Sequence, residues 1–157
     1  METKIVWCFK KAGAKIIEPN ENMQSSFTKL SIQTLKSAEM TLGQKDFVWA
    51  TSMIYYAEYY ALYSLLLKLG VKSENHECSL EIAGFLMDKS IDLKGVKRAK
   101  KLRIDAQYYL KTVSDDELQE ELRNAKIIVN DIINIINKLS TKEIKEYRNK
   151  LLKLIKS

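Results

Sequence analysis

The sequence predicts an all-α fold, an up-and-down helical bundle of four to five main helices with a short N-terminal helix. The 157 residues include only five glycines and one proline, so residues that form turns are scarce. The most common residues, such as Lys, Leu, Ile, Glu and Ala, mostly favour or tolerate helices. Apolar residues also recur at three- and four-residue steps over long stretches, which is the period of a helix with one buried face.

One domain, residues 1–157, is expected. The length suffices for a sizeable core, and no internal repeat, low-complexity segment or change in composition divides the chain. No run of about 18 uncharged apolar residues exists, and the N-terminus becomes charged too quickly for a signal peptide. We therefore expect a cytoplasmic protein that does not enter a membrane.

Cysteine and histidine are too few to predict a disulfide framework or a metal site. Cys8 and Cys78 are the two cysteines, and a cytoplasmic location predicts that both are reduced. His76 is the single histidine, so His76 and Cys78 supply at most two ligands, whereas a structural zinc site uses four. We expect neither a metal nor a cofactor.

The first two predicted elements are helices, and polar caps and glycines mark where they begin and end. Residues 3–11 form a short helix that stops at Gly13, and an irregular link follows it. Asn20 or Asn22 caps the second helix, whose apolar residues have helical spacing and which ends near Gly43.

The third helix, Asp46 to Gly70, is the long element around which the rest is organised. Four tyrosines follow the spacing of one helix face: Tyr56, Tyr59, Tyr60 and Tyr63. Small alanines on a second stripe, Ala57 and Ala61, allow another helix to approach closely. A face of tyrosines suits a core edge, a subunit interface or a polar cleft, because each ring is apolar and each hydroxyl needs a partner.

Four more helical patterns complete the bundle. A helix from His76 to Met87 precedes a basic helix from Lys94 to Leu110. Ser114 begins a capping-box sequence that opens a long amphipathic helix to Leu139, the expected main packing partner of the tyrosine helix. Ser140 begins a second capping box and the last helix.

The charge pattern leaves nucleic acid or a nucleotide open as a partner. The formal net charge is +6, and two separate stretches are basic, 94–103 and 138–156, while 114–121 is acidic. A solvated helix face explains any one of these stretches. Two basic stretches together also suit a phosphate-bearing ligand.

Several motifs resemble a known family. The third helix contains Trp49-x5-Tyr55-Tyr56-Ala57-x2-Tyr60-Ala61 and ends with Leu65-Leu66-x3-Gly70; the next loop has Lys72-x3-His76, and the basic helix has Arg103-Ile-Asp-Ala106-Gln107-Tyr108-Tyr109. In this order they resemble the HEPN family, the small helical domains of higher eukaryotes and prokaryotes. The resemblance covers roughly residues 22–139, between an N-terminal extension (1–21) and a C-terminal helix (140–157). The arginine motif is similar to the Arg-x-x-Ala-Asp-Tyr of a branch often found beside minimal nucleotidyltransferases.

The resemblance implies a homodimer with the arginine motif near a cleft between the subunits. Many members are metal-independent ribonucleases that use Arg-x(4 to 6)-His, in which imidazole transfers protons and guanidinium stabilises phosphate charge. Here Tyr108 stands where an Arg-x4-His motif starting at Arg103 would have its histidine. A phenol with a pKa near 10 is a poor general base, so we lean away from an enzyme.

Arg103 and Tyr108 are the candidates for any catalysis. A regular helix places them about 140° apart, so a joint site needs a distorted turn or the partner subunit, whereas Gln107 shares the face of Arg103. In the purely structural alternative, Arg103 pairs with a nearby carboxylate and Tyr108 packs. The candidates for nucleotide or RNA binding are Arg103, Gln107, Tyr109, Tyr59, His76 and Lys100.

Three functions stay open. The resemblance favours a nucleotide- or RNA-binding regulatory partner of a minimal nucleotidyltransferase, as in a toxin–antitoxin pair, with Tyr108 or Tyr109 as the acceptor of adenylate. The second is a metal-independent endoribonuclease in which Arg103 binds phosphate and Tyr108 or His76 donates a proton. The third is a helical interaction module without a ligand.

Overall fold

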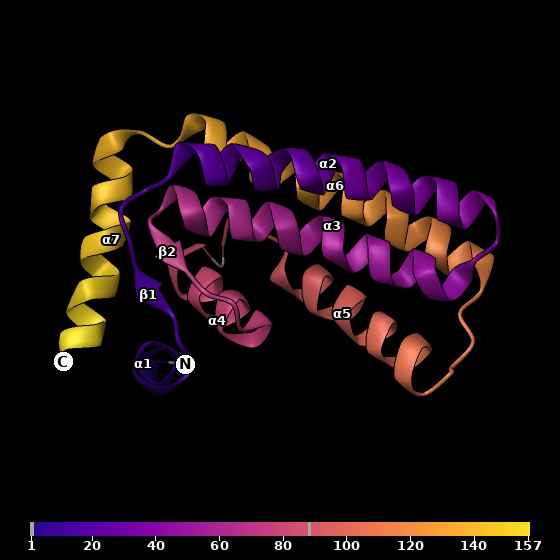
Figure 1. Cartoon of the computed structure of the whole chain (residues 1–157), viewed down its shortest axis with the longest axis horizontal. Helices are drawn as coiled ribbons and strands as arrows, with labels where there is room; N and C mark the ends of the chain where they lie inside the picture. Colours follow the sequence, from indigo (N-terminus) through magenta and orange to yellow (C-terminus); the bar gives the residue numbers. More distant parts are fainter. Residues whose placement is uncertain (1, 88) are drawn as a thin grey trace.

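The computed structural model describes residues 2–87 and 89–157, and most of them lie in helices (Figure 1). The helices are α1 (Glu2–Lys11), α2 (Glu21–Gly43), α3 (Phe47–Lys68), α4 (His76–Met87), α5 (Leu93–Tyr108), α6 (Asp115–Lys138) and α7 (Thr141–Lys156). The two short strands are β1 (Lys15–Ile16) and β2 (Val71–Lys72). The all-α prediction is confirmed. Within the described ranges, no helix is both long enough and apolar enough to cross a membrane.

The long helices α2, α3 and α6 lie side by side and form the body of the bundle (Figure 1). α3 is buried along most of its length, α4 and α5 also pack against it, and α7 runs across one end of the bundle. Because α3 is apolar on almost all sides, it forms the centre of the core, and every polar side chain on it needs a neighbour from another helix.

The main packing partner of α3 is α2, so the prediction that α6 has this role was wrong. α2 ends at Gly43, and it lies along α3 with a stripe of buried side chains that are small except for the last: Ser31, Thr34, Ala38 and Leu42. These side chains allow close approach, and the Ser31 hydroxyl donates to the Ala57 carbonyl of α3 at 2.6 Å. The amphipathic pattern of α6 predicts a buried face correctly but does not reveal how closely α2 packs.

Most of the predicted helix ends are observed. The Asn20 side chain accepts a hydrogen bond from the Met23 amide, and Ser114 accepts one from the Glu117 amide. Ser140 forms the complete capping box with Glu143. Asp46 occupies the cap position of α3 but makes no side-chain cap bond. α5 ends at Tyr108, two residues before the predicted end, and Leu110 has a positive φ of 52°.

The predicted irregular link after α1 contains a strand. β1 pairs antiparallel with β2, with Lys15 opposite Lys72 and Ile16 opposite Val71. Two residues are too few to show an alternating pattern, so no strand could be predicted from the sequence. This ribbon ties the N-terminal segment to the end of α3.

α7 is fastened to the same end of α3 by one arginine. Arg148 Nη1 donates to the carbonyls of Ile17, Leu69 and Gly70, at 2.8, 3.0 and 3.2 Å respectively. Gly70 has a φ of +73°, and a Cβ there would lie 1.7 Å from Arg148 Nη1. A residue without a side chain is therefore required where α3 ends.

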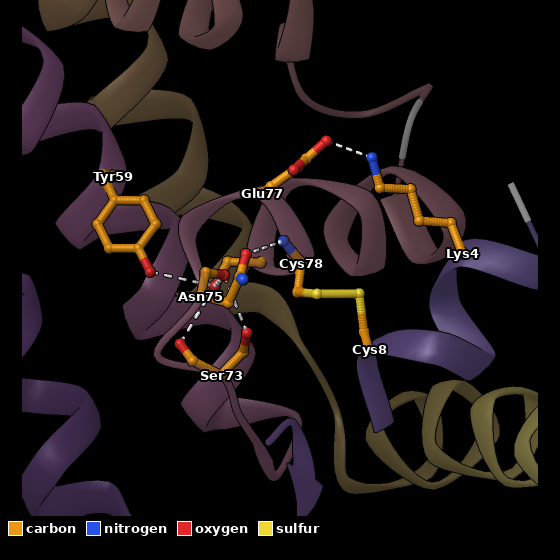
Figure 2. Close-up of a disulfide and its surroundings, with 8 residues drawn as sticks. Lys4, Cys8, Tyr59, Ser73, Asn75, Glu77 and Cys78 are labelled. Carbon is orange, nitrogen blue, oxygen red and sulfur yellow. Dashed lines mark hydrogen bonds and ion pairs between the residues drawn. A yellow bond between two sulfur atoms is a disulfide. The ribbon is translucent and has the colours of Figure 1, made fainter. Parts of the chain in front are cut away.

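Cys8 and Cys78 form a disulfide, so the prediction that both are reduced was wrong (Figure 2). The fold brings α1 against α4 with the two Cα atoms 5.7 Å apart, a separation that a disulfide bridges. Two isolated cysteines 70 residues apart in the chain give no sign of this pairing, because it depends on how the helices meet.

Candidate functional site

The tyrosine face of α3 divides into a buried row and a half-exposed row. Tyr55, Tyr59 and Tyr63 are buried, whereas Tyr56 and Tyr60 are half-buried and stack on each other with ring centroids 5.7 Å apart. Tyr59, one of the candidates for nucleotide or RNA binding, is only 5% exposed. Tyr56 and Tyr60 form the half-exposed edge of this face.

His76 is the first residue of α4, and it rests on the buried tyrosine row. Its Nδ1 lies 2.8 Å from the Tyr55 hydroxyl, and its ring stacks on the Tyr59 ring with a centroid distance of 3.9 Å. Burial lowers the pKa of His76, and the charges of Lys100 and Arg103 lower it further. The imidazole is therefore neutral near pH 7.

Tyr55 and Tyr59, the two buried tyrosines that contact His76, keep their hydroxyl protons. Burial raises the pKa of Tyr59 to about 12, although its hydrogen bond with Ser79 opposes the shift. Burial likewise raises the pKa of Tyr55. A protonated Tyr55 is able to donate to His76 Nδ1, which leaves the imidazole proton on Nε2.

Arg103, on α5, lies over the same tyrosines. Its guanidinium carbon is 5.3 Å from the centroid of the Tyr55 ring and 5.5 Å from that of Tyr56. Nη1 donates to Gln107 Oε1 at 3.3 Å, which agrees with the predicted shared helix face. Arg103 Nε is buried and has no hydrogen-bond partner among the described residues.

Residues from three helices therefore form one group, which we call the cationic cluster; its members are Tyr55, Tyr56, Tyr59, His76, Lys100, Arg103 and Gln107. Within residues 2–87 and 89–157, neither Lys100 nor Arg103 forms an ion pair. The structural alternative in which Arg103 pairs with a carboxylate is therefore not what the fold shows.

Carboxylates on the same two helices, α4 and α5, form ion pairs with other cations. Asp105 lies 2.6 Å from Lys101 and 3.9 Å from Lys111, and Glu77 pairs with Lys4. Among the described residues, the positive charge of the cationic cluster therefore has no carboxylate counter-ion. Such a surface suits an anion, and a phosphate group accepts hydrogen bonds from guanidinium with high directional preference.

Tyr108 and Tyr109 lie outside the cationic cluster. Tyr108 ends α5 with its side chain 66% exposed, and Tyr109 is 69% exposed. Arg103 instead faces the tyrosines of α3, so the predicted angular separation keeps Arg103 and Tyr108 on different faces. The alternative in which Tyr108 packs in the core is wrong. Both phenols are accessible to a partner protein.

Tyr55 joins His76 to Arg103, a role that the sequence did not reveal. The residue belongs to the aromatic motif of the third helix, and its ring is fully buried. Its hydroxyl nevertheless bonds His76, and its ring face contacts Arg103. A buried tyrosine hydroxyl needs a hydrogen-bond partner, which indicates that Tyr55 has one. The sequence does not show which residue it is, because the partner comes from a distant part of the chain.

A second polar group that the sequence did not reveal joins Glu58 of α3 and Glu121 of α6, and we call these two residues the acidic pair. Glu58 is 0% exposed, and neither carboxyl oxygen has a partner among the described residues. Burial raises the pKa of Glu58 well above its usual value, and the negative Glu121 adds to the shift. Glu121 accepts a hydrogen bond from Arg98 Nε at 2.6 Å. Glu58 is therefore a neutral acid.

No metal-binding group of three or more His, Cys, Asp or Glu side chains occurs in the part of the chain that the structure describes.

Comparison with protein families matches residues 26–153 to the family described as HEPN domain. A search of the curated proteins finds no match. The matched region includes α3, α4 and α5, and hence every residue of the cationic cluster.

Proposed function

The chain belongs to the HEPN family, and from this membership we propose that it is a nucleotide- or RNA-binding regulatory protein that works with a minimal nucleotidyltransferase. A toxin–antitoxin pair is the setting that we propose for the two proteins. The observation that carries the proposal is the cationic cluster, in which Arg103 and Lys100 have no ion-pair partner within the described ranges.

The chemistry of the cationic cluster suits a phosphate with an attached base. Arg103 and Lys100 supply charge, and Gln107, next to Arg103, supplies an amide. The half-exposed ring of Tyr56, together with that of Tyr60 beside the cluster, supplies flat surfaces on which a base is able to stack. Neutral His76 and the protonated tyrosine hydroxyls add no negative charge that would repel phosphate.

We further propose a homodimer and a modification site. Trp49 and Val48, at the start of α3, and Leu110, after α5, expose large apolar side chains near one end of the molecule, and a second copy would cover them. Tyr108 and Tyr109 are the proposed acceptors of adenylate. In that step the phenolic oxygen forms a bond to the α-phosphorus of ATP, pyrophosphate leaves, and the phenolic proton is released.

The endoribonuclease remains the second candidate because one observation favours it. His76 and Arg103 come from different helices, yet both contact Tyr55 and Tyr56. A neutral imidazole beside a guanidinium is a suitable pair for transferring a proton and stabilising phosphate charge. Within this candidate, His76 rather than Tyr108 is the proton-transfer group.

The binding proposal is tested with a fluorescently labelled single-stranded RNA octamer and with AMP. Arg103→Gln should weaken binding by about tenfold or more, because it removes charged hydrogen bonds to phosphate. Arg123→Gln is the matched control, since it makes the same charge change at an exposed pair with Glu120. Equal affinities for both variants and the wild type would contradict the proposal.

Co-expression with the product of the neighbouring gene tests the partnership. Intact-mass spectrometry should detect added adenylate, and Tyr108→Phe or Tyr109→Phe should identify the acceptor. The absence of both complex and adenylate would favour a helical interaction module without a ligand.

Incubation of RNA with the protein in chelator tests the second candidate. Cleavage that Arg103→Ala and His76→Ala both abolish, and that Tyr108→Phe leaves intact, would establish an endoribonuclease. Intact RNA in every sample would reject it.

A further inference from the structure

The N-terminal segment is held against the helix that carries His76. α1 and β1 precede residue 26, where the match to the family begins. Cys8 of α1 is joined to Cys78 of α4, and both side chains are fully buried. Cys78 lies two residues after His76, within the first turn of α4. The disulfide therefore fixes the same turn that presents His76 to the cationic cluster.

A hydrogen-bond network fixes this turn from the other side, as Figure 2 shows. Asn75 Oδ1 accepts from the Cys78 amide at 3.0 Å, and Ser79 Oγ donates toward the carbonyls of Ser73 and Asn75. The Tyr59 hydroxyl lies 3.1 Å from Ser79 Oγ. One covalent link and one polar network therefore meet at the turn, with His76 between Asn75 and Cys78.

We propose that the Cys8–Cys78 disulfide positions His76 in the cationic cluster, so that ligand binding there depends on the redox state of these two cysteines. The oxidised protein holds the first turn of α4 between α1 and α3. In the reduced protein that turn loses its covalent link to α1, and His76 samples positions away from Tyr55 and Tyr59. The consequence for ligand binding rests on the function proposed above, whereas the positioning of His76 does not.

The switching step is thiol–disulfide exchange with a dithiol reductant, which reaches the buried sulfurs when α1 moves transiently away from α4. A thiolate of the reductant attacks one sulfur of the disulfide and displaces the other as a thiolate, which takes up a proton. The second thiol of the reductant then closes its own disulfide and releases the first protein cysteine as a thiol. Two electrons and two protons pass to the protein, and the reductant becomes a disulfide.

Reduction is expected to loosen the turn without unfolding the bundle. The exposed ion pair of Lys4 and Glu77 and the pairing of β1 with β2 still connect the N-terminal segment to the rest of the chain. The bonds of Arg148 to the end of α3 do not involve α1. Reduction therefore affects the position of His76 more than it affects the fold.

The chain has a single histidine, so one imidazole NMR signal reports on the turn directly. The groups that face His76 are Tyr55, Tyr56 and Tyr59 from α3 and Lys100 and Arg103 from α5. In oxidised protein the pKa of His76 should lie below its ordinary value, because burial and the two cations lower it. After reduction with dithiothreitol the pKa should rise toward that ordinary value, and the signal should move.

Variants separate the disulfide from other effects of the reductant. Cys8→Ala should behave like the reduced wild type and should not respond to dithiothreitol. Lys4→Ala breaks the exposed ion pair beside the disulfide and should leave the His76 signal in its oxidised position. If Cys8→Ala does not fold, the wild type with and without dithiothreitol still gives the answer, with alkylation and mass measurement establishing the redox state.

The affinity for the RNA octamer should fall about tenfold on reduction if the binding-competent position of His76 drops to about one molecule in ten. A His76 signal that does not change between verified oxidised and reduced protein would overturn the proposal. Free thiols at both cysteines after purification under oxidising conditions would also overturn it. A redox-dependent His76 signal in a protein that binds neither RNA nor AMP would support the positioning of His76 and reject the proposed function.

Discussion

The cationic cluster and the acidic pair both include residues of the same stretch of α3, Tyr55 to Tyr59, yet their charges are neutralised in different ways. The cationic cluster is half-exposed and contains Arg103 and Lys100 with no ion-pair partner in the described ranges. The acidic pair is buried, and one partly exposed cation, Arg98, bonds only Glu121. Burial leaves Glu58 no access to a counter-ion from solvent, so a proton neutralises it.

This difference indicates which region is suited to a ligand. An exposed excess of positive charge is able to take up an anion from solution. A buried excess of negative charge is instead a matter of stability, because its neutralisation depends on pH. The acidic pair therefore affects the stability of the fold, whereas the cationic cluster is the region that we propose to bind the ligand.

The largest effect should come from removing the cation of the acidic pair. Arg98→Ala leaves the nearly buried Glu121 without its 2.6 Å partner and should lower the free energy of unfolding by about 2 kcal/mol, less than for a fully buried pair because the Arg98 side chain is 47% exposed. Urea unfolding measures this value. Arg123→Ala breaks an exposed pair and should cost about 0.5 kcal/mol or less. Similar losses in the two variants would contradict the distinction between buried and exposed pairs.

The next effect is a pH dependence that Glu58 causes. Because its folded-state pKa is raised, the folded protein holds the proton more tightly, and stability falls as pH rises from the usual glutamate value toward the folded-state pKa. One such group contributes a slope of at most about 1.4 kcal/mol per pH unit. Glu58→Gln should remove this slope, so the variant gains stability relative to wild type as pH rises. Parallel curves of unfolding free energy against pH would contradict the neutral state of Glu58.

A smaller effect should follow from changing one hydroxyl of the cationic cluster. Tyr55→Phe removes the 2.8 Å partner of His76 Nδ1 and should cost about 1 kcal/mol of stability. It should also change the imidazole tautomer, which the 15N shifts of the single histidine report. Tyr59→Phe is the matched control, since its hydroxyl bonds Ser79 instead of His76. Identical 15N shifts in the two variants would show that Tyr55 does not fix the tautomer.

The helices could be predicted from the sequence because their caps and periodic apolar residues are local. His76 does begin α4, Ser140 does form its capping box, and Gln107 does share a helix face with Arg103. Periodicity shows which face of one helix is apolar, but it does not show which helix covers that face. α3 is apolar nearly all round, so its pattern left open which tyrosine is buried.

The contacts that the sequence could not predict join residues far apart in the chain. His76 and Tyr55 are 21 residues apart, and Cys8 and Cys78 are 70 apart. Glu58 shows the same difficulty, because a single acid within an apolar helix gives no sign of whether solvent, a cation or a proton will neutralise it. These contacts became evident only from the packing of α4, α5 and α6 on α3.

Titration of the His76 NMR signal with and without AMP tests most directly whether His76 and Arg103 belong to one phosphate-binding site. The free protein should show a His76 pKa below the ordinary value, and AMP should raise it, because a nearby phosphate favours the imidazolium form. Arg103→Gln should weaken this response strongly, and Arg123→Gln should leave it unchanged. A His76 pKa that AMP does not alter, at concentrations that saturate binding, would contradict this shared site.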